Sequence, residues 1–74
     1  MKIVEVFKTN VEDHLAAGHI IFALQQTFPC CTINFDLADC DKILRIESQQ
    51  EPIAESEIQS LVAGLGYYCE RLPD

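Results

Sequence analysis

Basic residues are scarce in this sequence. Lys and Arg number 5 against 12 Asp and Glu, which gives a formal net charge of -7 at pH 7. The cations are also scattered, at Lys2, Lys8, Lys42, Arg45 and Arg71. Binding of nucleic acid or of an anionic membrane surface needs clustered cations. We therefore expect neither nucleic acid nor a membrane as a partner.

Long apolar runs and low-complexity tracts are missing too. The start, MKIVEVFK, has too short an apolar stretch for a signal peptide or a membrane span, so we expect a cytoplasmic protein. In that compartment the four cysteines are expected as free thiols. Gly and Pro number 3 each and 49% of residues are hydrophobic, which predicts one folded domain over residues 1–74.

Patterns typical of catalysis are absent as well. The sequence has no Gly-rich phosphate loop and no nucleophile with a positioned base. A chain of 74 residues also offers little room for a deep pocket. We expect no catalytic residues and no enzymatic activity.

Residues 2–8 are rich in β-branched side chains and predict a strand. Successive strand side chains point to opposite faces, so Glu5 shares a face with Ile3 and Phe7. Because a glutamate is expected on the outside, Val4 and Val6 are predicted to face the core.

A helix is predicted from Asn10 to Pro29. Asn10 is a favourable N-cap, and Asp13 resembles the reciprocal partner of a capping box. Apolar positions at helical spacing predict a buried stripe, which comprises Ala16, Ile20, Ala23, Leu24 and Thr27. Gly18 costs about 1 kcal/mol relative to Ala in a helix, which suggests close packing there.

The rest of the chain predicts a hairpin, a helix and a strand. Residues 31–37 alternate as a half-buried strand, 38–41 turn, and 42–48 return. A polar connection, 48–56, leads to a second helix that ends at Gly66 in a left-handed cap. Residues 67–72 form the last strand. The buried positions of the second helix are Ile58, Leu61, Val62 and Leu65.

This order of elements predicts an α+β fold. Right-handed crossovers give a four-stranded antiparallel sheet in the order 4-1-3-2, with both helices on one face. That is the ferredoxin-like βαββαβ open-faced sandwich. It places the first loop, the 38–41 turn and the Gly66–Tyr67 junction at one end of the sheet.

Two segments resemble the heavy-metal-associated (HMA) domain family, which includes small copper chaperones and modules of metal-transporting ATPases. FPCCTINFDLADCDKILRIE is similar to the family's hairpin, and EIQSLVAGLGYYCERL to its helix-to-strand segment, with Gly66 and Tyr67 as the most specific match. The resemblance covers essentially the whole chain and implies the same fold.

The family's metal site is a GMxCxxC segment at the start of the first helix, where two thiolates chelate Cu(I) or Zn(II). In the alignment that the resemblance implies, the two cysteine positions fall on Asp13 and Ala16. The chain therefore resembles a divergent HMA domain that lacks the CxxC motif, and we expect no cofactor.

Three of the four cysteines have structural interpretations. Cys31 and Cys69 are expected to be small core hydrophobes, since free Cys is often buried. Adjacent Cys30 and Cys31 are poorly placed to chelate one ion, because successive strand side chains diverge.

A metal site at the hairpin turn is an open alternative. Asp13, His14, Asp39, Cys40 and Asp41 would lie at one end of the sheet, and such groups suit Zn(II) or Cu(I). No CxxC or HxxxH spacing enforces their convergence. The competing interpretation is a solvated acidic turn beside a surface histidine.

The expected function is a non-catalytic interaction or self-association module. The helix-free face of the sheet is expected to carry Ile3, Phe7, Ile43, Tyr68 and Leu72, and such apolar patches mark interfaces. The occupant would be a protein partner or a second copy of the chain. The alternatives are a metal-homeostasis protein that uses Cys40, His14 and nearby carboxylates, and a small-ligand regulatory domain, which rests on fold alone.

Overall fold

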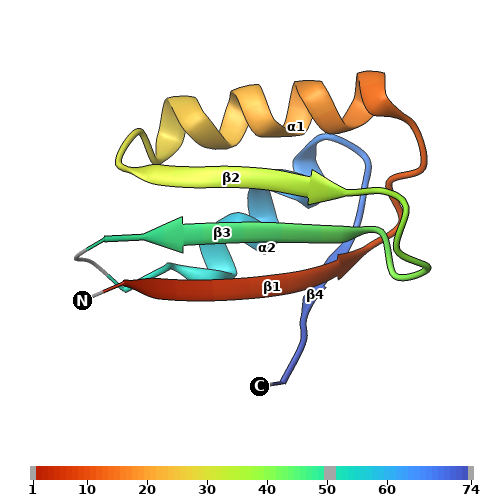
Figure 1. The fold of residues 1–74 in the computed structure, drawn as a ribbon. Helices are drawn as coiled ribbons and strands as arrows, with labels where there is room; N and C mark the ends of the chain where they lie inside the picture. Colours follow the sequence, from red (N-terminus) through yellow and green to blue (C-terminus); the bar gives the residue numbers. More distant parts are fainter. Residues whose placement is uncertain (1, 50–51, 74) are drawn as a thin grey trace.

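The computed structural model describes residues 2–49 and 52–73 (Figure 1). Its elements are β1 (Ile3–Thr9), α1 (His14–Thr27), β2 (Cys31–Asp36), β3 (Ile43–Ser48), α2 (Glu55–Gly64) and β4 (Cys69–Arg71). The strands form one antiparallel sheet in the order β2-β3-β1-β4, which is the predicted order read from the other edge. Both helices lie on one face, with α1 against β2 and α2 against β4. The ferredoxin-like fold is confirmed.

The core lies between the sheet and the helices. Its fully buried large side chains are Phe7, Val11, Ile20, Leu24, Leu44, Ile46, Ile58 and Val62. Burial of each Leu, Ile or Phe side chain contributes roughly 1.5–3 kcal/mol. The core therefore draws on both helices and on the central strands.

The predicted face of β1 is wrong. Phe7 is fully buried in the core, opposite Leu44 of β3. Ile3 shares the face of Phe7, so neither residue lies on the helix-free side. Val4 and Val6 occupy that side instead, because their positions alternate with that of Phe7.

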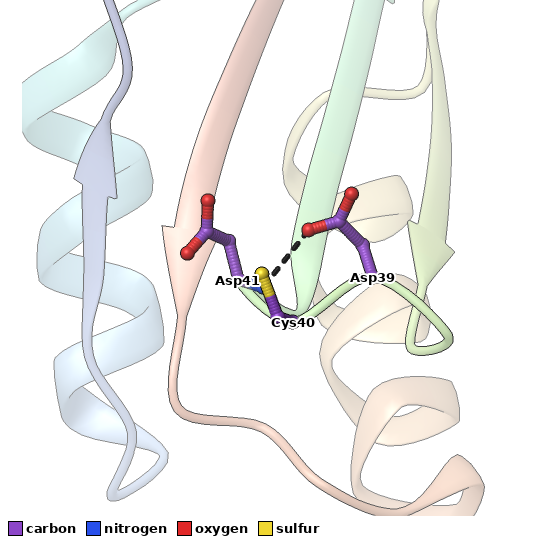
Figure 2. A group of neighbouring side chains, drawn as sticks. All are labelled: Asp39, Cys40 and Asp41. Carbon is purple, nitrogen blue, oxygen red and sulfur yellow. Dashed lines mark hydrogen bonds between the residues drawn. The ribbon is translucent and has the colours of Figure 1, made fainter.

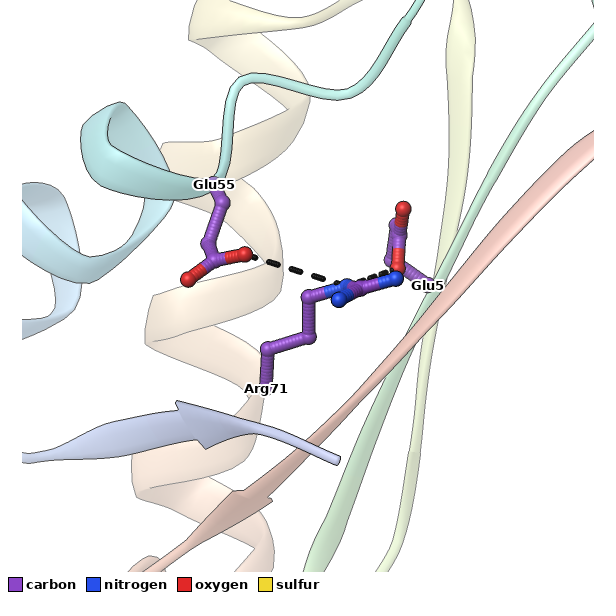
Figure 3. A network of polar contacts seen from close by, with 3 residues as sticks. All are labelled: Glu5, Glu55 and Arg71. Carbon is purple, nitrogen blue, oxygen red and sulfur yellow. Dashed lines mark hydrogen bonds and ion pairs between the residues drawn. The ribbon is translucent and has the colours of Figure 1, made fainter. Parts of the chain in front are cut away.

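An ion-pair network around Glu5 explains why the opposite face of β1 is buried (Figure 3). Arg71 of β4 donates from Nε to Glu5 Oε1 at 2.5 Å, and the same Nε lies 3.7 Å from Glu55 Oε1 of α2. A paired carboxylate is tolerated where an isolated one would be costly. The network lets Glu5 lie on the helix-covered face, and Phe7 follows it into the core.

Helix α1 begins later than predicted. The N-cap is Asp13, whose Oδ1 accepts the Ala16 N–H at 2.7 Å, so Asn10 is not the cap. Asn10 instead accepts the Tyr68 N–H on its Oδ1 at 2.9 Å, which ties the first loop to the start of β4. The buried residues of α1 are Ala16, Ala17, Ile20 and Leu24, without the predicted Ala23 and Thr27.

Helix α2 begins at Glu55, inside the predicted connection 48–56, of which residues 50–51 lie outside the described residues. The left-handed cap at its end is confirmed, since Gly66 has φ 93. The Gly66 N–H donates to the Ala63 carbonyl at 3.0 Å, and the Tyr67 N–H donates to the Val62 carbonyl at 3.1 Å. These two bonds form a Schellman motif. Strand β4 is shorter than the predicted 67–72.

Candidate functional site

The helix start is closed by its own hydrogen bonds. Val11 is fully buried, and its N–H donates to the Thr9 hydroxyl at 3.2 Å. That hydroxyl donates to the Lys42 carbonyl at 2.5 Å, and the Asp13 carboxylate is engaged by the Ala16 N–H. The donors here include a carboxylate and no sulfur, whereas Cu(I) prefers thiolates. A metal of the kind that the resemblance implies does not fit these residues.

Three side chains come together at the turn between β2 and β3 (Figure 2). Asp39, Cys40 and Asp41 each offer one ligand atom, and these atoms lie within 4.8 Å of one another. Asp39 Oδ1 accepts the Asp41 N–H at 2.9 Å, which stabilises the turn. One sulfur and two carboxylate oxygens are donors that Zn(II) takes, with a further position left for water.

The other two predicted ligands are not part of this group among the residues that the structure describes. Asp13 caps α1, and His14 is exposed as the first residue of that helix. The turn and the first loop do meet, as predicted, since the Thr9 N–H donates to the Asp41 carbonyl at 3.0 Å. This contact does not bring the Asp13 or His14 side chain into the group, and the side-chain cluster comes from the turn alone.

The helix-free face of the sheet carries apolar side chains from β1, β3 and both sides of β4. Register and alternation place Val4 and Val6 of β1 and Ile43 of β3 on this face, with Leu72 and Tyr68 flanking β4. The Leu72 N–H donates to the Val6 carbonyl at 2.8 Å, so these two residues are neighbours. Tyr68 is 48% exposed, and the other four are partly exposed. We refer to Val4, Val6, Ile43, Tyr68 and Leu72 as the open-face patch.

Ion pairs and hydrogen bonds lie within and beside the open-face patch, since Arg45 is opposite Val6 and Glu47 is opposite Val4. Glu47 Oε1 lies 2.9 Å from Lys2 Nζ, and Glu47 Oε2 lies 3.2 Å from Arg45 Nη1. The hydrogen bond from Lys2 lowers the pKa of Glu47. The Tyr68 hydroxyl donates to Glu70 Oε1 at 2.5 Å, and this bond raises the pKa of Tyr68. Apolar side chains mixed with hydrogen-bonded polar groups are the usual composition of a protein interface.

The end of the sheet opposite the 39–41 turn has a cavity of about 130 Å³. Its lining comprises Thr27, Phe28, Pro29, Cys30, Cys31, Ser48 and Pro52. Cys30 is exposed in the turn that precedes β2, and Cys31 packs partly buried against the core. These two thiols and the 39–41 turn therefore lie at different ends of β2.

Cys69 is buried, as predicted. Burial, with a smaller contribution from the negative charge of Glu55, raises the pKa of its thiol to about 11. Because the thiolate is the form that attacks electrophiles and binds metals, this thiol is inert near neutral pH. Cys69 is a structural residue.

Comparison with known proteins identifies one similarity in structure. A solved structure described as "Visualising the Metal-binding Versatility of Copper Trafficking Sites: Atx1 side-to-side (anaerobic)" matches with a TM-score of 0.66. The chain has the fold of Atx1. The match covers 92% of this chain and 98% of that one at 19% identity, so the likeness with Atx1 shows the fold alone.

No family model and no curated protein matches the chain. Within the described residues, no helix is both long and apolar enough to cross a membrane. The likeness to Atx1 supports the fold that the HMA resemblance implies, and no more than the fold.

Sequence reasoning missed two features. The Glu5–Arg71 pair joins residues 66 positions apart, and no local pattern reports such a contact. The second is an apolar outer surface on α1, where Leu15 is 72% and Phe22 is 67% exposed. Here a signal was present, because the stripe through Ile20 and Leu24 leaves Leu15 and Phe22 on the opposite side of the helix.

Proposed function

We propose that this chain is a single non-catalytic, cytoplasmic interaction domain that binds a protein partner through the open-face patch. The observation that carries the proposal is a helix-free sheet face on which partly exposed apolar side chains lie beside paired charges. A protein partner needs such a composition, whereas a small ligand needs a concave pocket.

Charge indicates the chemistry of the partner. Lys2, Lys8 and Arg45 are three of the five cations of the chain, and alternation along β1 and β3 places all three on the helix-free face. The rest of this acidic protein carries few positive charges to attract a ligand. Glu47 and Glu70 lie on the same face, and Glu47 pairs with Lys2 and Arg45, so the charges of this face largely balance. A partner surface with apolar side chains and polar groups of both signs therefore complements this face better than a strongly charged one.

The test is site-specific photo-crosslinking in the source cells, with a photoreactive residue at position 6 or 43, followed by purification of the crosslinked protein. Titration of that protein against purified variants then measures affinity. Val6→Asp and Ile43→Asp are expected to weaken binding by about tenfold or more each. Ser60→Asp, which adds the same charge on the exposed side of α2, is the matched control. Equal affinity of Val6→Asp and Ser60→Asp for the crosslinked protein would refute the proposal.

The second candidate function is divergent metal binding, which the convergence of Asp39, Cys40 and Asp41 favours. Ligand atoms of a tetrahedral Zn(II) site lie about 3.3–3.8 Å apart, as follows from bond lengths of about 2.0–2.3 Å. The turn side chains would close by rotation around an ion. Asp39 and Cys40 are exposed, so this rotation displaces no core residue.

Native mass spectrometry of the reduced protein, with and without stoichiometric Zn(II) or Cu(I), tests this candidate. Retention of one ion per chain that is lost in Cys40→Ser and kept in Cys30→Ser would support it. Retention that is lost only in Cys30→Ser would assign the ion to the opposite end of the sheet and contradict it.

A further inference from the structure

The outer surface of α1 carries large apolar side chains that nothing in the described chain covers. Leu15 and Phe22 are 72% and 67% exposed, and Gly18 and His19 are exposed between them. These four residues recur at i, i+3, i+4 and i+7, which places them on one side of the helix. We refer to Leu15, Gly18, His19 and Phe22 as the outer stripe.

Gly18 adds a depression to the outer stripe. A Cβ built at Gly18 would have nothing within 4 Å, so the glycine is not required by packing inside the chain. The close packing suggested by its position therefore has no partner in the described part of this chain. A glycine in mid-helix costs about 1 kcal/mol relative to alanine, and here it leaves a gap between two exposed apolar side chains.

Charge decides which occupant fits. Helix α1, HLAAGHIIFALQQT, contains no Asp, Glu, Lys or Arg, in a chain whose net charge is -7. Two such acidic chains repel each other over most of their surface. Contact along α1 places no carboxylate of one stripe against a carboxylate of the other. The surface is therefore one on which two copies of this chain can meet.

From this geometry we infer that the chain forms a homodimer through antiparallel packing of two α1 helices. An antiparallel pair brings the positive end of each helix dipole beside the negative end of the other, and α1 has no acidic side chain in its first turn and no basic one in its last. It also keeps Glu12 and Asp13 of one copy away from the same residues of the second copy. A parallel pair would oppose them.

A two-fold axis beside Gly18 and His19 makes the outer stripe self-complementary, as an isologous interface requires. Leu15 of one copy then lies against Phe22 of the other, and the His19 ring lies over the depression at Gly18. A 14-residue helix is about 21 Å long, so the interface is small and the dimer weak, with a Kd of roughly 10–500 µM.

The inference goes beyond the proposed function, because the outer stripe and the open-face patch lie on opposite sides of the molecule. The buried side of α1 faces the sheet, and the outer stripe faces away from it. Dimerisation therefore leaves both open-face patches accessible.

Sedimentation equilibrium of the reduced protein, from about 20 µM to about 1 mM, tests the inference. Phe22→Arg and Leu15→Arg are each expected to raise the dimer Kd about tenfold or more. This weakening is expected although each added cation makes the chain less negative and so reduces the general repulsion. Ser60→Arg makes the same change in charge on α2 and is expected to leave the dimer intact. A wild-type chain that is monomeric at 1 mM, or a dimer indifferent to Phe22→Arg, would overturn the inference.

The orientation has its own test. Leu15→Arg combined with Phe22→Glu is expected to associate more tightly than Leu15→Arg combined with Phe22→Arg, because only antiparallel packing opposes positions 15 and 22. No difference between the two double variants would overturn the antiparallel arrangement. Val6→Asp, compared with Ser60→Asp, is expected to leave the dimer Kd unchanged, and loss of the dimer there would assign self-association to the sheet instead. Far-UV circular dichroism establishes that each variant is folded.

Discussion

Asp13 at the start of α1 is either a helix cap that stabilises the fold or a ligand of a metal ion. The substitution Asp13→Ala distinguishes these two roles. The substitution removes the acceptor for the Ala16 N–H at 2.7 Å and the carboxylate beside the positive end of the helix. Ala16 is only 7% exposed, so water replaces the lost acceptor poorly. No acidic residue in the first turn compensates for the charge.

Loss of an N-cap side chain costs roughly 0.5–2 kcal/mol, and the burial of Ala16 places this site in the upper half of that range. With a urea m-value of about 1 kcal/mol/M for a small domain, the unfolding midpoint falls by about 1–2 M. Asp13→Asn keeps an acceptor oxygen and loses only the charge. Its midpoint should therefore fall by less than that of Asp13→Ala.

The assay is urea unfolding followed by far-UV circular dichroism, with Glu12→Ala as the control. Glu12 is exposed and next to Asp13, so Glu12→Ala removes the same charge without removing the cap. Equal midpoints for Asp13→Ala and Glu12→Ala would refute the capping argument. Loss of Zn(II) or Cu(I) retention in Asp13→Ala would show instead that Asp13 is a ligand, and the helix start would not be closed.

Four further substitutions test the packing of β1, the cap after α2 and the buried thiol. Phe7→Ala should destabilise the fold by about 3–5 kcal/mol and Val6→Ala by clearly less, and the reverse order in urea unfolding would contradict the observed faces of β1. Gly66→Ala should cost more than about 1 kcal/mol because φ is 93 there, and an unchanged thermal midpoint would contradict this. Burial raises the pKa of Cys69 from the ordinary value of 9.0 to about 11 in the folded state. The free energy of unfolding should therefore fall as pH rises between these two values, by at most about 2.7 kcal/mol. Cys69→Ala should flatten this decline.

The fold was predictable because its signals are local. Alternation in residues 31–37 and 42–48, the helical spacing from Ile58 to Leu65 and the glycine at position 66 each report on a few neighbouring residues. These elements appear close to where the sequence indicates them, and their order leaves few topologies. The exception is Leu65, which was predicted to be buried and is 42% exposed after the end of α2. Even the cap at Gly66, which depends on backbone conformation, was accessible from residue type.

The predictions that failed depend on contacts between distant residues. Glu5 indicated an outward face for Phe7, and the guanidinium of Arg71, which Glu5 shares with Glu55, makes the opposite face favourable. The N-cap shifted to Asp13 because Asn10 is used by Tyr68. In both cases the sequence predicted a local role for a polar side chain, whereas the structure pairs it with a residue that is distant in sequence.

The same limit applies to the candidate site. Sequence could assemble Asp39, Cys40 and Asp41 because they are consecutive, and it placed His14 near them by topology alone. The fold does bring the first loop to the hairpin turn, but the contacts are made by Thr9 and not by Asp13 or His14. Nearness of two segments did not decide which side chains meet, because Asp13 has a local acceptor role that topology does not reveal.

The two proposed interaction surfaces would act together. A dimer through the outer stripe presents two open-face patches, so a partner that carries two binding segments gains the effective concentration of the second one, about millimolar for short flexible linkers. Phe22→Arg should then weaken binding to a bivalent partner while leaving the affinity for a single segment unchanged. Val6→Asp should weaken both. A weak dimer suffices for this effect, because the bivalent partner itself favours the paired state by mass action. Equal loss of monovalent and bivalent affinity in Phe22→Arg would show that α1 belongs to the partner-binding surface itself.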